Sequence, residues 1–200
     1  MDPKILSGLA GVVYALGTFP YWYTIWKKQS RPSIASWLIW FLIDAISLAG
    51  MWAEHQLNGL IIAATILSFI TLLCAFWCGS WKWQKLDTVC LAGALLGIVL
   101  WQLSSDATVG IVIASIVNII GAIPTVEGAW SEPERENRFT WTAYWISCVI
   151  ALASLTEFTL TSAAQPISFT IVETAMIMIV WLRPRRTRIS TASSDDSCLL

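Results

Sequence analysis

Two acidic side chains, Asp44 and Glu173, occur inside long apolar stretches of the 200-residue sequence. A charge at the centre of a membrane costs at least about 2.5–3.5 kcal/mol, so such a residue faces a protein interior, becomes neutral or serves a function. Asp44 is eleven residues beyond Ser33, which is roughly 16 Å at a rise of about 1.5 Å per residue. Glu173 is seven residues beyond Pro166. Both carboxyl groups are therefore candidates for binding a solute or carrying a proton.

Aromatic residues accompany Asp44 at helical spacing. Trp37, Trp40 and Asp44 follow the spacing i, i+3, i+7 and therefore share one stripe of a helix. A later stretch repeats this spacing at Trp141, Tyr144 and Cys148. Tyr14 and Asn118 each lie nine residues into their own stretches, at a similar depth.

These residues together predict a polar site flanked by aromatic rings. The candidate substrate-binding residues are Tyr14, Trp37, Trp40, Asp44, Asn118, Trp141, Tyr144 and Glu173. Rings that stack on apolar faces and carboxylates that accept hydrogen bonds suit a sugar-like or zwitterionic solute. The alternative is a purely structural polar network, in which a protonated Asp44 hydrogen-bonds a neighbouring helix.

The stretches that position these residues are those of a helical membrane protein. Hydrophobic residues make up 56% of the chain and charged residues only 12%. In lipid, backbone groups are satisfied only in helices or closed barrels, and these apolar stretches are continuous rather than alternating. We therefore predict an all-α integral membrane protein with seven transmembrane helices, at 5–26, 33–52, 58–77, 88–103, 109–129, 139–158 and 166–182. The net charge of −1 argues against a nucleic-acid partner.

The positions of the basic residues predict the orientation. With seven spans, eleven of the twelve Lys and Arg residues fall on one side of the bilayer, and only Lys4 falls on the other. Basic residues are in excess on the cytoplasmic side of membrane proteins. The N-terminus is therefore expected outside and the C-terminus in the cytoplasm. We interpret the basic cluster at 183–188 as a cytoplasmic anchor, with a lipid-headgroup site as the alternative.

An internal repeat emerges when the sequence is shifted by 104 residues without gaps. Three tryptophan pairs coincide in this register, namely Trp26 with Trp130, Trp37 with Trp141 and Trp77 with Trp181. Each copy holds three spans, and one extra helix gives the second copy the same orientation as the first, in a 3+1+3 arrangement of parallel repeats. The predicted units are a first three-helix repeat at 1–80, a linker helix at 81–106, a second three-helix repeat at 107–183 and a disordered cytoplasmic tail at 184–200.

Paired glycines and prolines in the first helix of each copy are candidate hinges. Gly17 matches Gly121, and Pro20 matches Pro124, in the same register. A proline inside a helix frees a carbonyl one turn back and kinks the helix. A moving hinge and a static kink are both consistent with this pattern.

The two copies resemble the PQ-loop and SWEET superfamily of transporters. The first copy reads GTFPYWYTIWKKQSRPSIASWLIWFLIDAISLAG, with a proline in the first helix, a basic loop and a second helix that carries Asp44. Tyr21 and Thr125 follow the two prolines in place of the glutamine that names the PQ motif. A group of uncharacterised bacterial seven-helix membrane proteins is more similar still, because they share Ser-Trp-x-Ile-Trp at the start of the second helix, which here reads SWLIW. The resemblance implies rocking about the paired prolines, proton coupling at Asp44 and a prokaryotic inner membrane.

We therefore predict a membrane transporter for a small polar solute (a sugar, amino acid or organic acid) that works by alternating access, with proton coupling through Asp44 or Glu173 left open. A non-transporting receptor or scaffold on the same fold is the alternative. An enzyme is not expected, because the sequence has no HExxH, no GxSxG and no paired histidines. No cofactor or metal is expected, since Cys74 and Cys78 lack a second ligand pair. The expected partners are the lipid bilayer, the solute and protons, and a homo-oligomer is left open.

Overall fold

The described part of the chain is entirely helical. The computed structural model describes residues 2–29, 32, 34–79, 83 and 85–183. The predicted tail at 184–200 lies outside these described residues. The described residues form the helices α1 (Pro3–Trp26), α2 (Ile34–Ala53), α3 (Gly59–Cys78), α4 (Lys85–Ser104), α5 (Ala107–Gly121), α6 (Ile123–Ser131), the 3-10 helix η1 (Pro133–Arg135), α7 (Arg138–Ala153) and α8 (Leu160–Leu182), and no strand.

Six helical stretches in the described residues are long and apolar enough to cross a membrane. They are α1, α2, α3, α4, the stretch Ala107–Ser131 that contains α5 and α6, and α8. The protein is therefore all-α, and its apolar helices indicate a membrane environment. α7 is shorter, with 16 residues, or about 24 Å against a hydrocarbon core of about 30 Å.

Polar side chains at the edges of the apolar stretches define where several helices begin. Asn58 accepts a hydrogen bond from the backbone N–H of Ile61 at the start of α3, at 2.9 Å. Asn137 caps the start of α7 in the same way, and Thr159 and Ser162 form a capping box at the start of α8. Each cap satisfies N–H groups of the first turn that have no partner inside the helix.

The boundaries of the last two long helices differ from the predicted ones. The predicted last span begins at Pro166, whereas α8 begins at Leu160 and carries Pro166 in its interior. The capping box before Pro166 starts the helix early, and membrane helices tolerate an interior proline when neighbouring groups compensate for the lost N–H. α7 ends at Ala153 rather than at the predicted Phe158.

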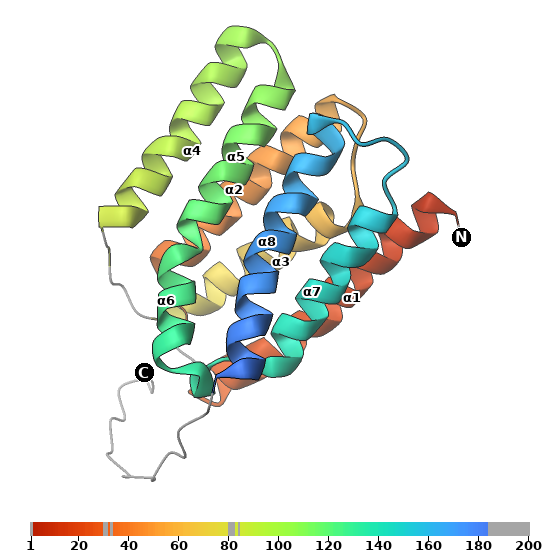
Figure 1. Ribbon diagram of the computed structural model, residues 1–200. Helices are drawn as coiled ribbons and strands as arrows, with labels where there is room; N and C mark the ends of the chain where they lie inside the picture. Colours follow the sequence, from red (N-terminus) through yellow and green to blue (C-terminus); the bar gives the residue numbers. More distant parts are fainter. Residues whose placement is uncertain (1, 30–31, 33, 80–82, 84, 184–200) are drawn as a thin grey trace, which may run out of the picture.

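The helices pack in a pattern that recurs in the two parts of the chain (Figure 1). α3 packs against both α1 and α2, and α8 packs against both α5 and α7. Two further large interfaces, α1 with α7 and α2 with α5, join these groups. α4 lies at one edge of the bundle, where it packs mainly against α5.

Buried side chains form apolar clusters at these interfaces. The largest cluster joins α1, α3, α7 and α8 and includes Ala64, Tyr144 and Met176. A second cluster joins α2, α4 and α5 around Ile43 and Val117. Membrane helices associate by close packing rather than by exclusion of water, so the close packing of the side chains in these clusters holds the candidate site in place.

Candidate functional site

Tyr14 and Tyr144 meet face to face where α1 packs against α7. Their ring centroids are 4.2 Å apart, and the ring planes differ by 13°. The Thr18 hydroxyl donates to the Tyr14 carbonyl at 3.0 Å. Because that hydroxyl has one proton, the Tyr144 hydroxyl is the donor in its 2.9 Å contact with Thr18 Oγ1. The stacked rings leave no room for a solute between them.

A close approach of α1 and α7 at Gly17 allows this stack. A Cβ atom on Gly17 would lie 2.7 Å from the Ala143 Cβ and 3.2 Å from the Tyr144 ring. Nearby, Ser147 Oγ donates to the Ala10 carbonyl at 2.7 Å. The predicted hinge glycine is thus needed for contact between two helices.

Asp44 lies buried on α2, with 4% of its surface exposed. The Ser68 hydroxyl on α3 lies close enough to its carboxyl group to serve as a hydrogen-bond donor. Ser68 also lies 3.2 Å from the Thr65 carbonyl oxygen. The stretches 34–54 and 56–81, which supply these two helices, contain no Lys, Arg or His. Asp44 therefore has a hydroxyl partner but no cationic partner from α2 or α3.

Glu173 is buried on α8, with 7% of its surface exposed. Its Oε2 atom is buried and has no hydrogen-bond partner in the described part of the chain. Tyr14, Tyr144 and Cys148 are close enough to interact electrostatically with this carboxyl group. Buried polar atoms normally have a partner, and an unsatisfied one costs about 1–3 kcal/mol. Glu173 therefore presents a buried acceptor oxygen that can take a hydrogen bond from a donor outside the described residues.

The two acids converge on Tyr14, which interacts electrostatically with both Asp44 and Glu173. Asp44 is ten residues beyond Ile34, at the start of α2, or about 15 Å. Glu173 is nine residues before Leu182, at the end of α8, or about 14 Å. The start of α2 and the end of α8 lie at the same, lower end of the bundle (Figure 1). The two acids thus lie at similar depth from that end.

Trp37 and Trp40 form an aromatic group on α2. Their rings are edge to face, with centroids 5.1 Å apart, and the Trp37 ring is 5.7 Å from the ring of Tyr21 on α1. Tyr21 in turn interacts electrostatically with Tyr144. The two tryptophans therefore adjoin the tyrosine pair through Tyr21.

Trp141 adjoins Tyr144 on α7. The two rings are edge to face, with centroids 5.9 Å apart. The Trp141 indole N–H donates to the Glu136 carboxylate at 2.7 Å. Because its only donor is engaged, Trp141 offers a solute the face of a ring and no hydrogen bond.

Asn118 belongs to a second polar group, which α3, α5 and α8 form. Its amide nitrogen is 3.5 Å from Ser168 Oγ, and Ser168 donates to the Gln165 backbone carbonyl at 2.8 Å. The Gln165 side-chain oxygen accepts a hydrogen bond from Asn58 at 3.3 Å, while its Nε2 atom is buried without a partner in the described residues. The predicted residues therefore divide between the tyrosine pair with its acids, the α2 tryptophans and this amide group.

The two predicted proline hinges lie in different local structures. Pro20 lies inside α1, which is continuous around it. Pro124 lies in the first turn of α6, and Ala122 separates α5 from α6. Pro124 has no N–H to offer the Ile120 carbonyl, whereas the Ala122 N–H donates to the Asn118 carbonyl at 3.0 Å. A break between two helices thus occurs beside Pro124 and not beside Pro20.

The two glycines of the predicted hinges also differ. A Cβ atom on Gly121 would meet Cys90 Sγ at 3.5 Å, an ordinary van der Waals contact. Gly17, by contrast, has no room for a Cβ atom. Only Gly17 is therefore required by packing.

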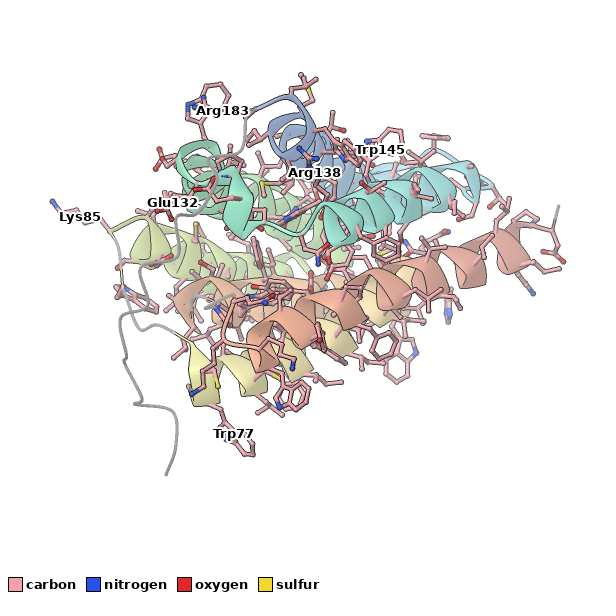
Figure 2. The ribbon with its side chains drawn as sticks, turned by 90° about the horizontal axis from the view of Figure 1, so that it is seen from below. Trp77, Lys85, Glu132, Arg138, Trp145 and Arg183 are labelled. Atoms are coloured by element: carbon pink, nitrogen blue, oxygen red, sulfur yellow. The ribbon has the colours of Figure 1, made fainter. Side chains whose placement is uncertain are left out.

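Basic residues at the lower end of the bundle stack on tryptophans. The Arg183 guanidinium is 3.9 Å from the centroid of the Trp130 ring, and that of Arg138 is 4.9 Å from the centroid of the Trp181 ring. Arg138 Nε also donates to the Val180 carbonyl at 2.8 Å. Figure 2, a view from below, shows Arg138 beside α7 and Arg183 at the edge of the bundle. These contacts join the ends of α6, α7 and α8.

The sequence did not single out three residues of the site, Thr18, Ser68 and Gln165. Thr18 is one helical turn from Tyr14, so the spacing of the two residues could have indicated a shared stripe. Gln165 fell in a predicted loop because the predicted span began at Pro166. A lone serine such as Ser68 in an apolar helix carries no signal of its own.

The chain matches no family model, no curated protein and no solved structure. The function therefore rests on the geometry of the site. That geometry provides two buried carboxyl groups that can bind protons, a stacked tyrosine pair, and amide groups on the neighbouring helices.

Proposed function

We propose that this protein is a membrane transporter for a small polar solute and works by alternating access. The burial of two acids, Asp44 and Glu173, inside the apolar helical bundle is the observation that supports it most strongly. Ionisable residues inside membrane bundles are costly, and they mark paths for solutes or protons. Two buried acids without a cationic partner in their own helices suit such a path better than a structural ion pair.

We also propose that α7 is a seventh span and that the chain forms two parallel three-helix repeats joined by α4. The packing supports this division, because α3 contacts α1 and α2 just as α8 contacts α5 and α7. Exchanging the two copies also converts the α1–α7 interface into the α5–α2 interface. A short span such as α7 can be accommodated by local thinning of the bilayer. A solute path would then run along the axis between the copies.

We place the protein in the cell inner membrane, with its N-terminus outside and its C-terminus in the cytoplasm. Lys4 lies at the start of α1, whereas Lys85, Arg138 and Arg183 lie at the opposite end of the bundle (Figures 1 and 2). This asymmetry follows the excess of basic residues on the cytoplasmic side. The resemblance to the PQ-loop and SWEET superfamily agrees with this placement.

The contact between Asp44 and Ser68 suggests how a proton could be carried. The Ser68 hydroxyl has one proton and two acceptors, the Asp44 carboxyl and the Thr65 carbonyl. When Asp44 is ionised, the Ser68 hydroxyl donates its hydrogen bond to the Asp44 carboxylate. A protonated Asp44 instead donates to Ser68 Oγ, and Ser68 then donates to Thr65. Binding or loss of one proton thus reverses a hydrogen bond between α2 and α3.

The tyrosine pair serves as the barrier in this mechanism. Tyr14 and Tyr144 fill the space between α1 and α7 with rings 4.2 Å apart. A solute can pass only after the two rings separate, which requires the Tyr144–Thr18 hydrogen bond to break. The interruption of the α5–α6 stretch at Ala122 is the proposed place where the second copy bends.

The proton step is tested with purified protein in liposomes that contain a pH-sensitive dye. Sugars, amino acids and organic acids are added in turn, and the change of internal pH is recorded. We expect at least one solute to move protons with the wild-type protein. The Asp44→Asn variant keeps the shape of the side chain but cannot titrate, so it should lose this signal. The exposed Glu54 supplies the matched control Glu54→Gln, which should retain it.

One observation favours a second function, that of a non-transporting receptor or scaffold. Ser68 caps Asp44, and the stacked tyrosines fill the centre of the α1–α7 interface. A scaffold would keep both contacts permanently. It would bind a solute or a protein without moving either protons or solute, so the liposome measurement separates the two functions.

A further inference from the structure

The unpartnered oxygen of Glu173 indicates what kind of solute the site takes. Glu173 Oε2 is buried and lacks a hydrogen-bond partner in the described residues. A carboxylate accepts hydrogen bonds and carries negative charge, so a group that both donates and is positive satisfies it best. Water could supply the hydrogen bond but not the positive charge that an ionised Glu173 needs.

The chain itself supplies no positive charge at this depth. The stretches 5–26, 34–54, 56–81, 86–134 and 139–182, which cover the apolar part of every helix, contain no Lys, Arg or His. The first basic residues on either side of Glu173 in the sequence are Arg138 and Arg183, and they stack on tryptophans at the end of the bundle. A cation beside Glu173 therefore has to come from outside the chain.

The hydroxyl groups of two tyrosines offer further acceptor oxygens in the neighbourhood of this carboxyl group. The hydroxyls of Tyr14 and Tyr144 interact electrostatically with Glu173. Each phenolic oxygen can accept a hydrogen bond, and the proton of the Tyr144 hydroxyl is directed away toward Thr18. One carboxylate and two phenolic oxygens match the three N–H donors of a primary ammonium group.

We propose that the solute carries a primary ammonium group and that Glu173 binds this group together with the hydroxyls of Tyr14 and Tyr144. This inference rests on the proposed transport function and narrows its solute to cationic or zwitterionic amines. Asp44 has its own partner in Ser68 and is not part of the ammonium site. Neutral sugars and simple organic acids, which cannot neutralise Glu173, are disfavoured.

Three small probes of similar shape test the charge preference. Ethanolammonium, ethylene glycol and glycolate share a hydroxymethyl group and differ in the charge of the other end. Binding to the full-length protein in detergent is measured near neutral pH by calorimetry, with the melting temperature followed in parallel. We expect ethanolammonium to bind and to raise the melting temperature, because a ligand of the native state stabilises it. Ethylene glycol and glycolate should do neither.

Matched variants connect this binding to Glu173. Glu173→Gln should weaken ethanolammonium binding by about tenfold or more, because a charged hydrogen bond is lost. Glu173→Asp keeps the charge, so it should keep the preference for the cation even if its affinity falls. Glu157→Gln neutralises an exposed acid outside the site and should bind as the wild type does.

Equal binding of ethylene glycol would overturn the ammonium site, and so would unchanged affinity in Glu173→Gln. Equal stabilisation by potassium chloride alone would assign the site to an inorganic cation instead. Equilibrium binding does not require transport. Ethanolammonium that binds but never crosses the liposome membrane would therefore contradict the transport function and leave the ammonium site intact. Transport of a different solute without ethanolammonium binding would contradict the ammonium site and leave the transport function intact.

Discussion

The buried hydroxyl groups of Thr18 and Ser68 link helices near the acids, and they differ in whether the direction of their hydrogen bond can change. Thr18 donates to the Tyr14 carbonyl, which fixes the Tyr144 hydroxyl as the donor to Thr18. Ser68 has a choice between a backbone carbonyl and the Asp44 carboxyl. The direction of the first contact is therefore constant, whereas the direction of the second follows the protonation of Asp44. In the proposed mechanism, this difference makes α2 and α3, rather than α1 and α7, the helices that respond to a proton.

At the residue scale, the paired glycines provide a matched test of packing. Gly17→Ala places a methyl group 2.7 Å from the Ala143 Cβ, and such overpacking costs about 1–3 kcal/mol. Gly121→Ala meets its nearest atom at 3.5 Å and gains up to about 1 kcal/mol of helix propensity. We expect the melting temperature in detergent to fall for Gly17→Ala and to hold or rise for Gly121→Ala. Equal melting temperatures would contradict the close α1–α7 contact.

At the scale of elements, the apolar stretches were predictable and their interruptions were not. Continuous hydrophobicity predicted helices around Asp44 and Tyr14, and both residues lie inside helices as expected. Proline at 166 suggested a helix start, whereas the capping box at Thr159 places the start earlier. A cap depends on local hydrogen bonds that hydropathy does not record. The matched prolines also looked equivalent, yet only Pro124 follows a helix break.

The status of α7 as a membrane span has a direct test. Glu157 is exposed and lies between α7 and α8. If α7 crosses the membrane and the N-terminus is outside, as proposed, this residue is outside the cell. Glu157→Cys in a cysteine-free background should then react with a membrane-impermeant thiol reagent added to intact cells. A cysteine placed at Lys28, which the proposed orientation puts on the cytoplasmic side, should react only after the cells are opened. Protection of position 157 in intact cells would leave six spans and remove the parallel repeat.

At the scale of the whole molecule, the two proposed copies have similar helix packing, but their acidic residues are at positions that do not match. Asp44 lies on the second helix of the first copy, and its match in the 104-residue register is Cys148. Glu173 lies on the third helix of the second copy, and its match is Phe69. The recurring helix contacts agree with the proposed repeat. The sequence already places the two acids on different helices, but the side chains that they meet across those helices, such as Ser68, depend on packing that a sequence does not display.

The central claim is transport, and the flux of solute into liposomes tests it most directly. Purified protein is reconstituted, an imposed proton gradient is applied, and uptake of a radiolabelled solute that binds the protein is followed. We predict saturable uptake that stops when the gradient is collapsed and that is lost in Asp44→Asn. A solute that binds the protein but shows no protein-dependent flux under any gradient would contradict the account.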